Sequence, residues 1–230
     1  MISQLLSALL VTAAFAGLAY ALGMISRSGA LGGLLVGTTI YVSLGPRGFA
    51  ILALFVIGGS LLTRLGYGSK QRSGTAQEHG GRRGARNALA NCAVATFCAI
   101  LAATGSEHSI AAFVASLGAA FADTAESEIG QLFSRTPRLI TTLQKAPPGT
   151  DGAVSFQGTL AGAGAAGLTA ALGLALGMLE TPPSAILVAI AAFLGTVVDS
   201  LIGSLSPRAG NELTNVLCTL VAALLALTFV

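Results

Sequence analysis

Apolar runs long enough to cross a membrane fill most of this chain. Charged residues make up 9% of the 230 positions and hydrophobic residues 53%, with a mean hydropathy of +0.81. A water-soluble domain carries about 25% charged residues. This deficit excludes a soluble fold and predicts an integral membrane protein, an all-α bundle that crosses the membrane several times.

Eight apolar runs can be separated, and each is read as one membrane span. They are Ile2–Leu22, Gly29–Ser43, Phe49–Leu62, Ala88–Thr104, Ile110–Ile129, Val154–Leu179, Ala185–Leu205 and Leu213–Val230. The second and third are short and are joined by a tight turn, Gly45–Gly48. We therefore predict about eight transmembrane helices in one membrane domain, residues 1–230.

Basic residues predict the orientation of these spans. Of the twelve Lys and Arg, only Arg47 falls on one side of the alternating helices. The other eleven are Arg27, Arg64, Lys70, Arg72, Arg82, Arg83, Arg86, Arg135, Arg138, Lys145 and Arg208. The positive-inside rule makes their side cytoplasmic and places both termini outside. No Lys or Arg precedes the first span, which favours an uncleaved helix over a secretory signal. We expect the chain in the plasma membrane of a bacterium.

Carboxylates lie near the ends of two apolar runs. Asp123, Glu126 and Glu128 end one run, and in a helix Asp123 and Glu126 share a face. Asp199 lies in the otherwise apolar segment Thr196–Leu201. Carboxylates in hydrocarbon are costly unless they are neutralised, and oxygen ligands suit Mg²⁺. We predict that these four acids bind Mg²⁺, with ion pairing to loop arginines as the alternative.

Two polar segments carry most of the basic side chains, and we predict that these loops, 64–87 and 130–152, form the active-site face. The candidate phosphate-binding residues among them are Arg64, Lys70, Arg82, Arg83, Arg86, Arg138 and Lys145. The segment Gly80–Arg86 mixes flexible backbone with guanidinium groups, which suits bidentate binding of phosphate. Contact with anionic lipid is the alternative for some of these residues.

Two asparagines and one glycine-rich motif complete the candidates. Asn91 and Asn215 each lie just inside a span from the cytoplasmic side, where an amide either bridges helices or orients substrate or a metal-bound water. Gly162–Gly167 matches GxGxxG, but no strand precedes it, so the motif indicates close helix packing and not a dinucleotide site.

These residues suit phosphoryl transfer at a membrane face. That reaction depends mainly on a metal, cations and alignment of the reactants. An acceptor that is itself a phosphate is already ionised near neutral pH, so it needs no strong general base. The membrane setting suggests an acceptor with its hydrocarbon tail between the helices and its head at the cytoplasmic face.

Several motifs together resemble one known family. They are Gly59–Gly66, Glu78–Asn91, Ala122–Gly130 and the segment from Pro137 to Gly152. They look like the corresponding parts of the phytyl-phosphate kinase family, integral membrane proteins long catalogued as a domain of unknown function. The resemblance covers most of the chain.

The resemblance implies a kinase that transfers the γ-phosphate of a nucleoside triphosphate, CTP first, to a phytyl or other prenyl monophosphate. Asp123, Glu126 and Asp199 would hold Mg²⁺. The segments Arg64–Arg86 and Lys145–Gly152, the latter with Gly149, Thr150 and Asp151, would grip nucleotide and acceptor phosphates. Partners are then a nucleoside triphosphate, a prenyl monophosphate lipid and the membrane, and no nucleic acid is expected.

Two other functions suit the same residues. Embedded acids and glycine-broken helices are also found in transporters, so a flippase for a phosphorylated or anionic lipid is the main alternative. An enzyme that attaches a nucleotide to a lipid phosphate, with pyrophosphate as its product, is the third.

Overall fold

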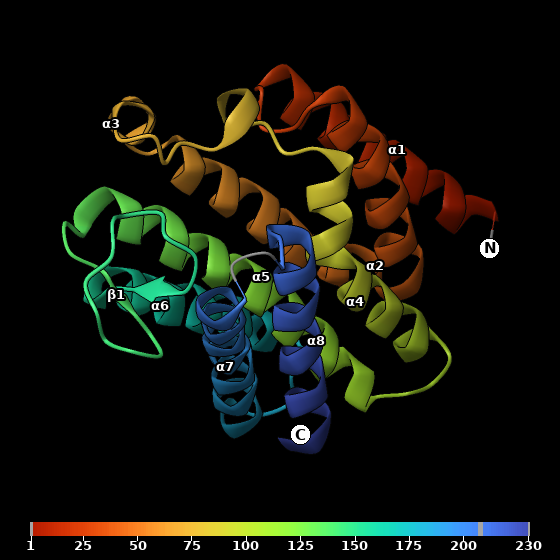
Figure 1. Cartoon of the computed structure of the whole chain (residues 1–230). Helices are drawn as coiled ribbons and strands as arrows, with labels where there is room; N and C mark the ends of the chain where they lie inside the picture. Colours follow the sequence, from red (N-terminus) through yellow and green to blue (C-terminus); the bar gives the residue numbers. More distant parts are fainter. Residues whose placement is uncertain (1, 207–208, 230) are drawn as a thin grey trace.

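The described part of the chain forms eight α-helices, one 3₁₀ turn and a two-stranded hairpin (Figure 1). The computed structural model describes residues 2–206 and 209–229. The elements are α1 Ile2–Ala21, α2 Arg27–Arg64, α3 Tyr67–Arg72, η1 Glu78–Gly81, α4 Ala85–Ala103, α5 His108–Phe133, β1 Arg138–Leu139, β2 Ala153–Val154, α6 Phe156–Ala175, α7 Pro182–Leu205 and α8 Asn211–Phe229. Arg208 and Val230, which the sequence analysis assigned to a loop and to the last span, lie outside the described residues.

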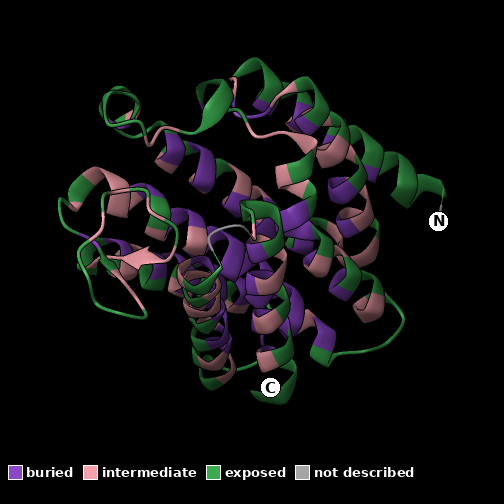
Figure 2. Cartoon of the chain, viewed as in Figure 1, coloured by how far each residue is buried: buried purple, intermediate pink, exposed green. Residues whose placement is uncertain are grey.

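Helix α5 is the centre of the bundle. It packs against α2, α4, α6, α7 and α8, and every residue from Ala111 to Ala122 is buried (Figure 2). Small residues dominate this stretch, so neighbouring helices approach it closely. A helix surrounded by protein is shielded from lipid, which lets its last turns carry the acids Asp123, Glu126 and Glu128.

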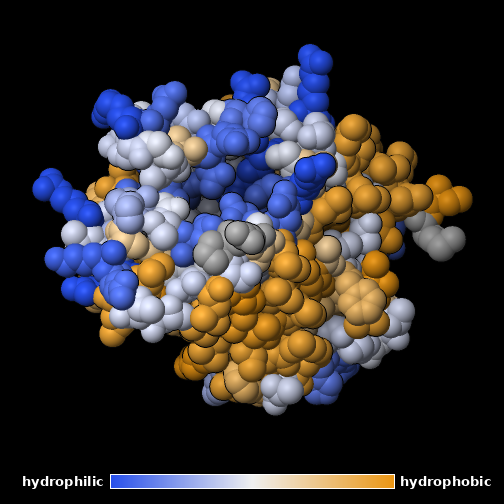
Figure 3. Space-filling view, viewed as in Figure 1, coloured by the Kyte–Doolittle hydropathy of each residue, from blue (hydrophilic) through white to orange (hydrophobic). Residues whose placement is uncertain are grey.

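The outer helices turn apolar side chains outward. Ile2, Leu31, Phe156 and Leu205 are among the large hydrophobic residues that are mostly exposed, and orange surface covers much of the molecule in Figure 3. Within the described ranges, α1, α2, α4, α6, α7 and α8 are long and apolar enough to cross a membrane. The predicted all-α membrane bundle is confirmed. The count of eight spans stays a prediction, because α5 is not among these six and α2 was expected to supply two.

Helix α2 folds back on itself. Gly45 has φ 66° and ψ −160°, a conformation open to glycine, and Pro46 begins the second limb. Gly29 in the first limb and Gly59 in the second both lie against Arg83, although 30 residues of straight helix span about 45 Å. The turn predicted at Gly45–Gly48 is therefore present, and the two limbs run antiparallel.

Glycines bring α6 close to α5 beside the acids. A side chain at Gly158 would lie 2.6 Å from the backbone oxygen of Glu126, and one at Gly162 would lie 3.4 Å from the Glu126 side chain. Gly164 and Gly167 have open space around them. The GxGxxG segment thus lies in a packed helix, as predicted, and two glycines four residues apart make its closest contact.

The polar loops gather at one end of the bundle. Every described lysine and arginine except Arg47 lies at the end where α1, α5 and α7 finish, and Arg47 lies at the opposite end beside Gly177. Strand β1 pairs antiparallel with β2. Gly152, the residue before β2, has φ 73°, and Ser204 of α7 lies against it. This contact docks the loop before α6 onto the end of α7.

Accessibility in cells tests the predicted orientation. Ser73→Cys and Gln144→Cys place a thiol in the basic loops, and Ser106→Cys places one at the opposite end; all three positions are exposed. The native cysteines are buried and give little background. If the basic loops are cytoplasmic, a membrane-impermeant maleimide added to intact bacteria labels only Ser106→Cys, and permeabilisation exposes the other two. The reverse pattern would overturn the orientation.

Candidate functional site

Acids from three parts of the chain meet at the polar end of the bundle. Asp123 lies in α5 and Asp199 in α7, and their carboxyl groups are close enough for the charge of Asp199 to act on Asp123. Asp151, from the loop that docks on α7, acts on Asp199 in the same way. The structure thus brings together Asp123 and Asp199, which are 76 positions apart in the sequence.

The Asp123–Asp199 pair is not neutralised by a nearby cation. Within residues 2–206 and 209–229, no lysine or arginine nitrogen lies within 4.0 Å of Asp123, Glu126 or Asp199. The Oδ1 atom of Asp199 is buried and has no hydrogen-bond partner. Buried carboxylates in this state need protons, a cation or polar ligands. The described loop arginines therefore form no ion pair with these three acids.

Glu126 is held by hydroxyl groups. Its Oε1 accepts a hydrogen bond from Thr159 Oγ1 of α6 at 3.2 Å, and the Thr196 hydroxyl of α7 is within hydrogen-bonding reach. Thr214 of α8 lies in the same relation to Asp199. The sequence analysis missed these threonines; for Thr196, the signal was its position three residues before Asp199, on the same helix face.

Glu128 and Lys70 form a buried ion pair. Lys70 Nζ lies 2.5 Å from Glu128 Oε2 and also donates to the carbonyl oxygens of Leu62 and Thr63, at 3.1 and 2.8 Å. Lys70 is 2% exposed and Glu128 3%. All three protons of the ammonium group are used. This geometry fastens α3 to the ends of α2 and α5. Phosphate binding was predicted for Lys70 and Mg²⁺ binding for Glu128, but our proposal assigns neither ligand to this pair.

Arg83 is a basic residue whose charge acts on Asp123. Its guanidinium donates to Thr124 Oγ1 of α5 at 3.2 Å, lies 5.2 Å from the centre of the Phe55 ring, and acts on the charge of Asp123. Its backbone pairs with the segment before α2, since Arg83 N–H donates to the Met24 oxygen. Burial lowers the pKa of Arg83 from its ordinary value, an effect that the charge of Glu128 opposes.

The remaining predicted bases lie on the surface of this end, seen as the blue region of Figure 3. Arg64 donates to the Leu22 carbonyl oxygen, and Arg138 donates to the Leu143 oxygen at 2.7 Å, so both brace the backbone. Arg82, Arg86 and Lys145 are exposed and form none of the ion pairs of the described residues.

A small polar pocket adjoins Asp199. It has a volume of about 290 Å³ and lies where α7, α8 and the docked loop meet. Its lining residues are Asp151, Gly152, Asp199, Gly203, Ser206, Gly210, Asn211 and Thr214. Gly149 and Thr150 build the turn beside it, in which Thr150 donates to the Pro147 oxygen through both its N–H and its hydroxyl.

The two predicted asparagines differ. Asn91 is buried, and its Nδ2 donates to the Asn87 backbone oxygen of the same helix at 2.9 Å, a bond that neither bridges two helices nor reaches a ligand, so both predicted roles stay predictions. Asn215 is half-buried in α8, one turn along from Asn211 of the polar pocket. Asn87, which the sequence analysis did not select, has a buried Oδ1 without a hydrogen-bond partner.

The acids are not arranged as a complete metal-binding group. In the described part of the chain, no three His, Cys, Asp or Glu side chains are gathered as ligands. The four-carboxylate arrangement predicted from the sequence is therefore not preassembled. The unpartnered Oδ1 of Asp199 beside Asp123 still fits Mg²⁺, which takes one or two carboxylates and completes its shell with waters and substrate phosphates.

The Lys70–Glu128 pair leads to a stability prediction. Lys70→Met leaves a buried carboxylate without its partner, and we expect the free energy of unfolding to fall by about 3–5 kcal/mol. Replacing both partners, Lys70→Met with Glu128→Leu, should cost less than either single change. Arg72→Met, on the exposed side of the same helix, is the control. Thermal unfolding of the purified protein in detergent measures all four, and normal stability of Lys70→Met with weakened nucleotide binding would restore the phosphate-binding role.

Comparison with known proteins identifies the family of this chain. The model of a family described as integral membrane protein DUF92 matches residues 10–223. An uncharacterized membrane protein of Synechocystis is 35% identical over 200 residues, which cover 84% of this chain and 77% of that protein. One from Methanocaldococcus jannaschii is 33% identical over 205 residues, covering 87% and 84%.

A plant relative is similar over less of its own length. Protein VTE6, chloroplastic, of Arabidopsis thaliana is 34% identical over 186 residues, which cover 78% of this chain and 56% of that protein. No solved structure matches the chain. The family match spans nearly all of the described helices and confirms the resemblance seen in the motifs. The chain belongs to the DUF92 family of integral membrane proteins.

Proposed function

We propose that this chain is a membrane kinase that transfers the γ-phosphate of a nucleoside triphosphate, CTP first, to a phytyl or other prenyl monophosphate. One observation carries the proposal. Asp123 and Asp199 act on each other at the polar end of a membrane bundle, no ion pair of the described residues neutralises them, and the charge of Arg83 reaches Asp123. The family resemblance and the similarity to VTE6 agree with it.

The reaction needs little covalent help from the protein. An oxygen of the acceptor phosphate forms a bond to the γ-phosphorus, the bond from that phosphorus to the β,γ-bridging oxygen breaks, and the nucleoside diphosphate leaves. The acceptor is ionised near pH 7, since the second pKa of a phosphate monoester is about 6. No proton has to be removed, which agrees with the lack of a histidine beside the acids: His79 and His108 are exposed and lie outside the site.

In this proposal the chain's own groups align the reactants. Arg83 binds the acceptor phosphate with its guanidinium fork, and the polar pocket beside Asp199 takes the triphosphate end of the donor. Thr159, Thr196 and Thr214 keep the carboxylates oriented. Asp123 and Asp199, with Glu126 nearby, would hold Mg²⁺, which when bound supplies neutralisation of the phosphate oxygens.

Replacement of either aspartate should remove turnover. We expect Asp123→Asn and Asp199→Asn each to lower the rate roughly 100-fold or more, because each loses negative charge where the metal is proposed, while side-chain volume is kept. Glu180→Gln, an exposed acid at the far end, is the matched control. The assay follows formation of prenyl diphosphate from CTP and phytyl phosphate in detergent with Mg²⁺, with thermal unfolding as the check on folding. Wild-type rates in either aspartate variant would remove the assignment.

A flippase for a lipid anion is the second candidate, because Arg83 also faces an apolar cavity between helices. The two functions differ in their products. A kinase converts the lipid and consumes nucleotide in detergent, where no gradient exists. A flippase leaves the lipid unchanged, and a nucleotidyl-transferring enzyme releases pyrophosphate instead of a nucleoside diphosphate. Mass analysis of the products after incubation with each nucleotide and a prenyl phosphate panel separates the three.

A further inference from the structure

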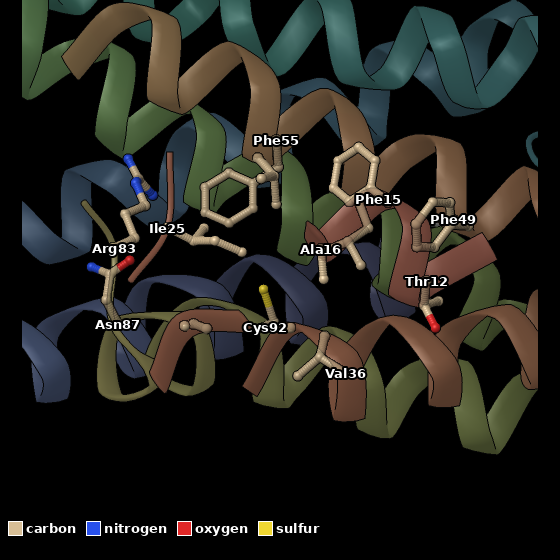
Figure 4. Close-up of a pocket in the computed structure, with 15 residues that line it drawn as sticks. Thr12, Phe15, Ala16, Ile25, Val36, Phe49, Phe55, Arg83, Asn87 and Cys92 are labelled. Atoms are coloured by element: carbon tan, nitrogen blue, oxygen red, sulfur yellow. The ribbon is translucent and has the colours of Figure 1, made fainter. Parts of the chain in front are cut away.

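Arg83, whose charge acts on Asp123, also lines an apolar cavity. The cavity lies between α1, the two limbs of α2 and the start of α4 (Figure 4), and the empty space there, open solvent at its mouth included, is about 610 Å³. Phe15, Phe49 and Phe55 contribute aromatic walls, and nearly all other lining groups are aliphatic, glycine or sulfur. Such a lining favours a hydrocarbon ligand over a nucleotide.

The polar groups of this cavity that are open to a ligand lie at one end. Figure 4 shows Arg83 and Asn87 together at one end and Thr12 at the other. The Thr12 hydroxyl is already bonded to the Ala8 oxygen, at 2.7 Å, and to Thr38. Asn87 has an unpartnered amide oxygen, and rotation of its amide presents N–H donors instead. The cavity is therefore apolar along its length and cationic at its head.

Arg83 at this head lacks an anionic partner. Among the described residues, no carboxylate oxygen lies within 4.0 Å of its guanidinium, and Thr124 is the one side chain to which it is hydrogen-bonded. A guanidinium has five donors in a fork that matches phosphate oxygens. A half-buried arginine with unused donors beside an apolar cavity is the arrangement that an anionic lipid head requires.

Glycines in α2 open the cavity. One wall of the cavity is a stretch of α2 about 10 Å long, with Gly29, Gly33 and Val36 facing the cavity. Gly29 lets the Arg83 backbone approach, since a Cβ there would lie 2.2 Å from the Arg83 oxygen. A Cβ at Gly33 would meet nothing within 4 Å. A side chain placed at Gly33 would thus project into free space that the cavity provides.

From this geometry we propose that the apolar cavity binds the head-proximal hydrocarbon of a single-chain lipid phosphate, with the phosphate on Arg83 and Asn87. The inference rests on the proposed function in naming this lipid as the acceptor. It adds the place where the tail lies, and it puts the acceptor phosphate between the cavity and Asp123, on which Arg83 acts. Acceptor and donor then enter from opposite sides of the acids, through the apolar cavity and the polar pocket.

Filling the cavity tests the tail site. Gly33→Leu in the full chain should weaken binding of phytyl phosphate about tenfold or more, because the leucine occupies the tail's space. Binding of dimethylallyl phosphate, with its short tail, and of CTP should not change. Gly167→Leu is the matched control, since Gly167 is also a half-buried membrane-helix glycine with nothing within 4 Å, but lies in α6 outside the cavity. Affinities are measured on purified protein in detergent, and unchanged phytyl phosphate affinity in Gly33→Leu would overturn the proposal.

Arg83 tests the head of the site. Arg83→Gln should lower affinity for phytyl phosphate about tenfold or more, while leaving that for phytol, which has no phosphate, unchanged. Arg47→Gln, an exposed arginine at the opposite end of the bundle, is the control and should behave as wild type. Equal losses for the alcohol and the phosphate would show a general packing defect and contradict the assignment.

A third measurement does not depend on any variant folding. A phytyl phosphate analogue with a photoreactive diazirine near its head should label peptides of α1, α2 or α4 in the wild-type protein, and labelling confined to α6 or α7 would overturn the cavity assignment. Labelling in the cavity without turnover would refute the kinase and keep the lipid site. Turnover with labelling elsewhere would do the opposite, so the two proposals fail separately.

Discussion

The cost of carboxylates inside an apolar bundle is the constraint on which the rest of this structure depends. An acid facing lipid would have to be protonated or removed, so the acids lie on α5, which protein surrounds on all sides, and on the inner face of α7. Small residues make that burial geometrically feasible, since Gly158 and Gly162 let α6 cover Glu126 closely. The outer helices can then be uniformly apolar, as a lipid-facing surface must be.

The buried acids of this bundle differ in whether a basic side chain neutralises them. Glu128 is paired with Lys70, whose protons are all bonded, and the pair joins α3, α2 and α5. Such a site is complete and has nothing left to offer a ligand. Asp123 and Asp199 have no such partner, and Asp199 keeps a buried oxygen without a hydrogen bond. One acid is thus neutralised fully while its neighbours stay open, and this difference is why the proposed function assigns metal and phosphate to Asp123 and Asp199 and not to Glu128.

Arg83 connects the parts of this end of the molecule. Its backbone ties the loop before α4 to the start of α2, its side chain lines the apolar cavity, and its charge acts on Asp123. Arg83 is therefore shared by the apolar cavity, which suits hydrocarbon, and the proposed metal and nucleotide site at Asp123. A phosphate at this boundary would be held by a fixed fork, whereas the exposed bases Arg82, Arg86 and Lys145 offer mainly attraction at longer range.

The membrane bundle, the turn at Gly45, the gathering of the basic residues at one end and the unusual acids could all be predicted from the amino-acid sequence. Hydrophobic run length, glycine and charge act locally along the chain, so their effects can be read without the fold. The sequence did not separate Glu128 from Asp123, or Arg83 from Arg82, since those differences arise from partners 58 and 41 residues away. Only the tertiary structure decided which charges are neutralised, because that depends on which helices pack side by side. The same packing leaves the cavity beside Arg83, a space that no local pattern encodes.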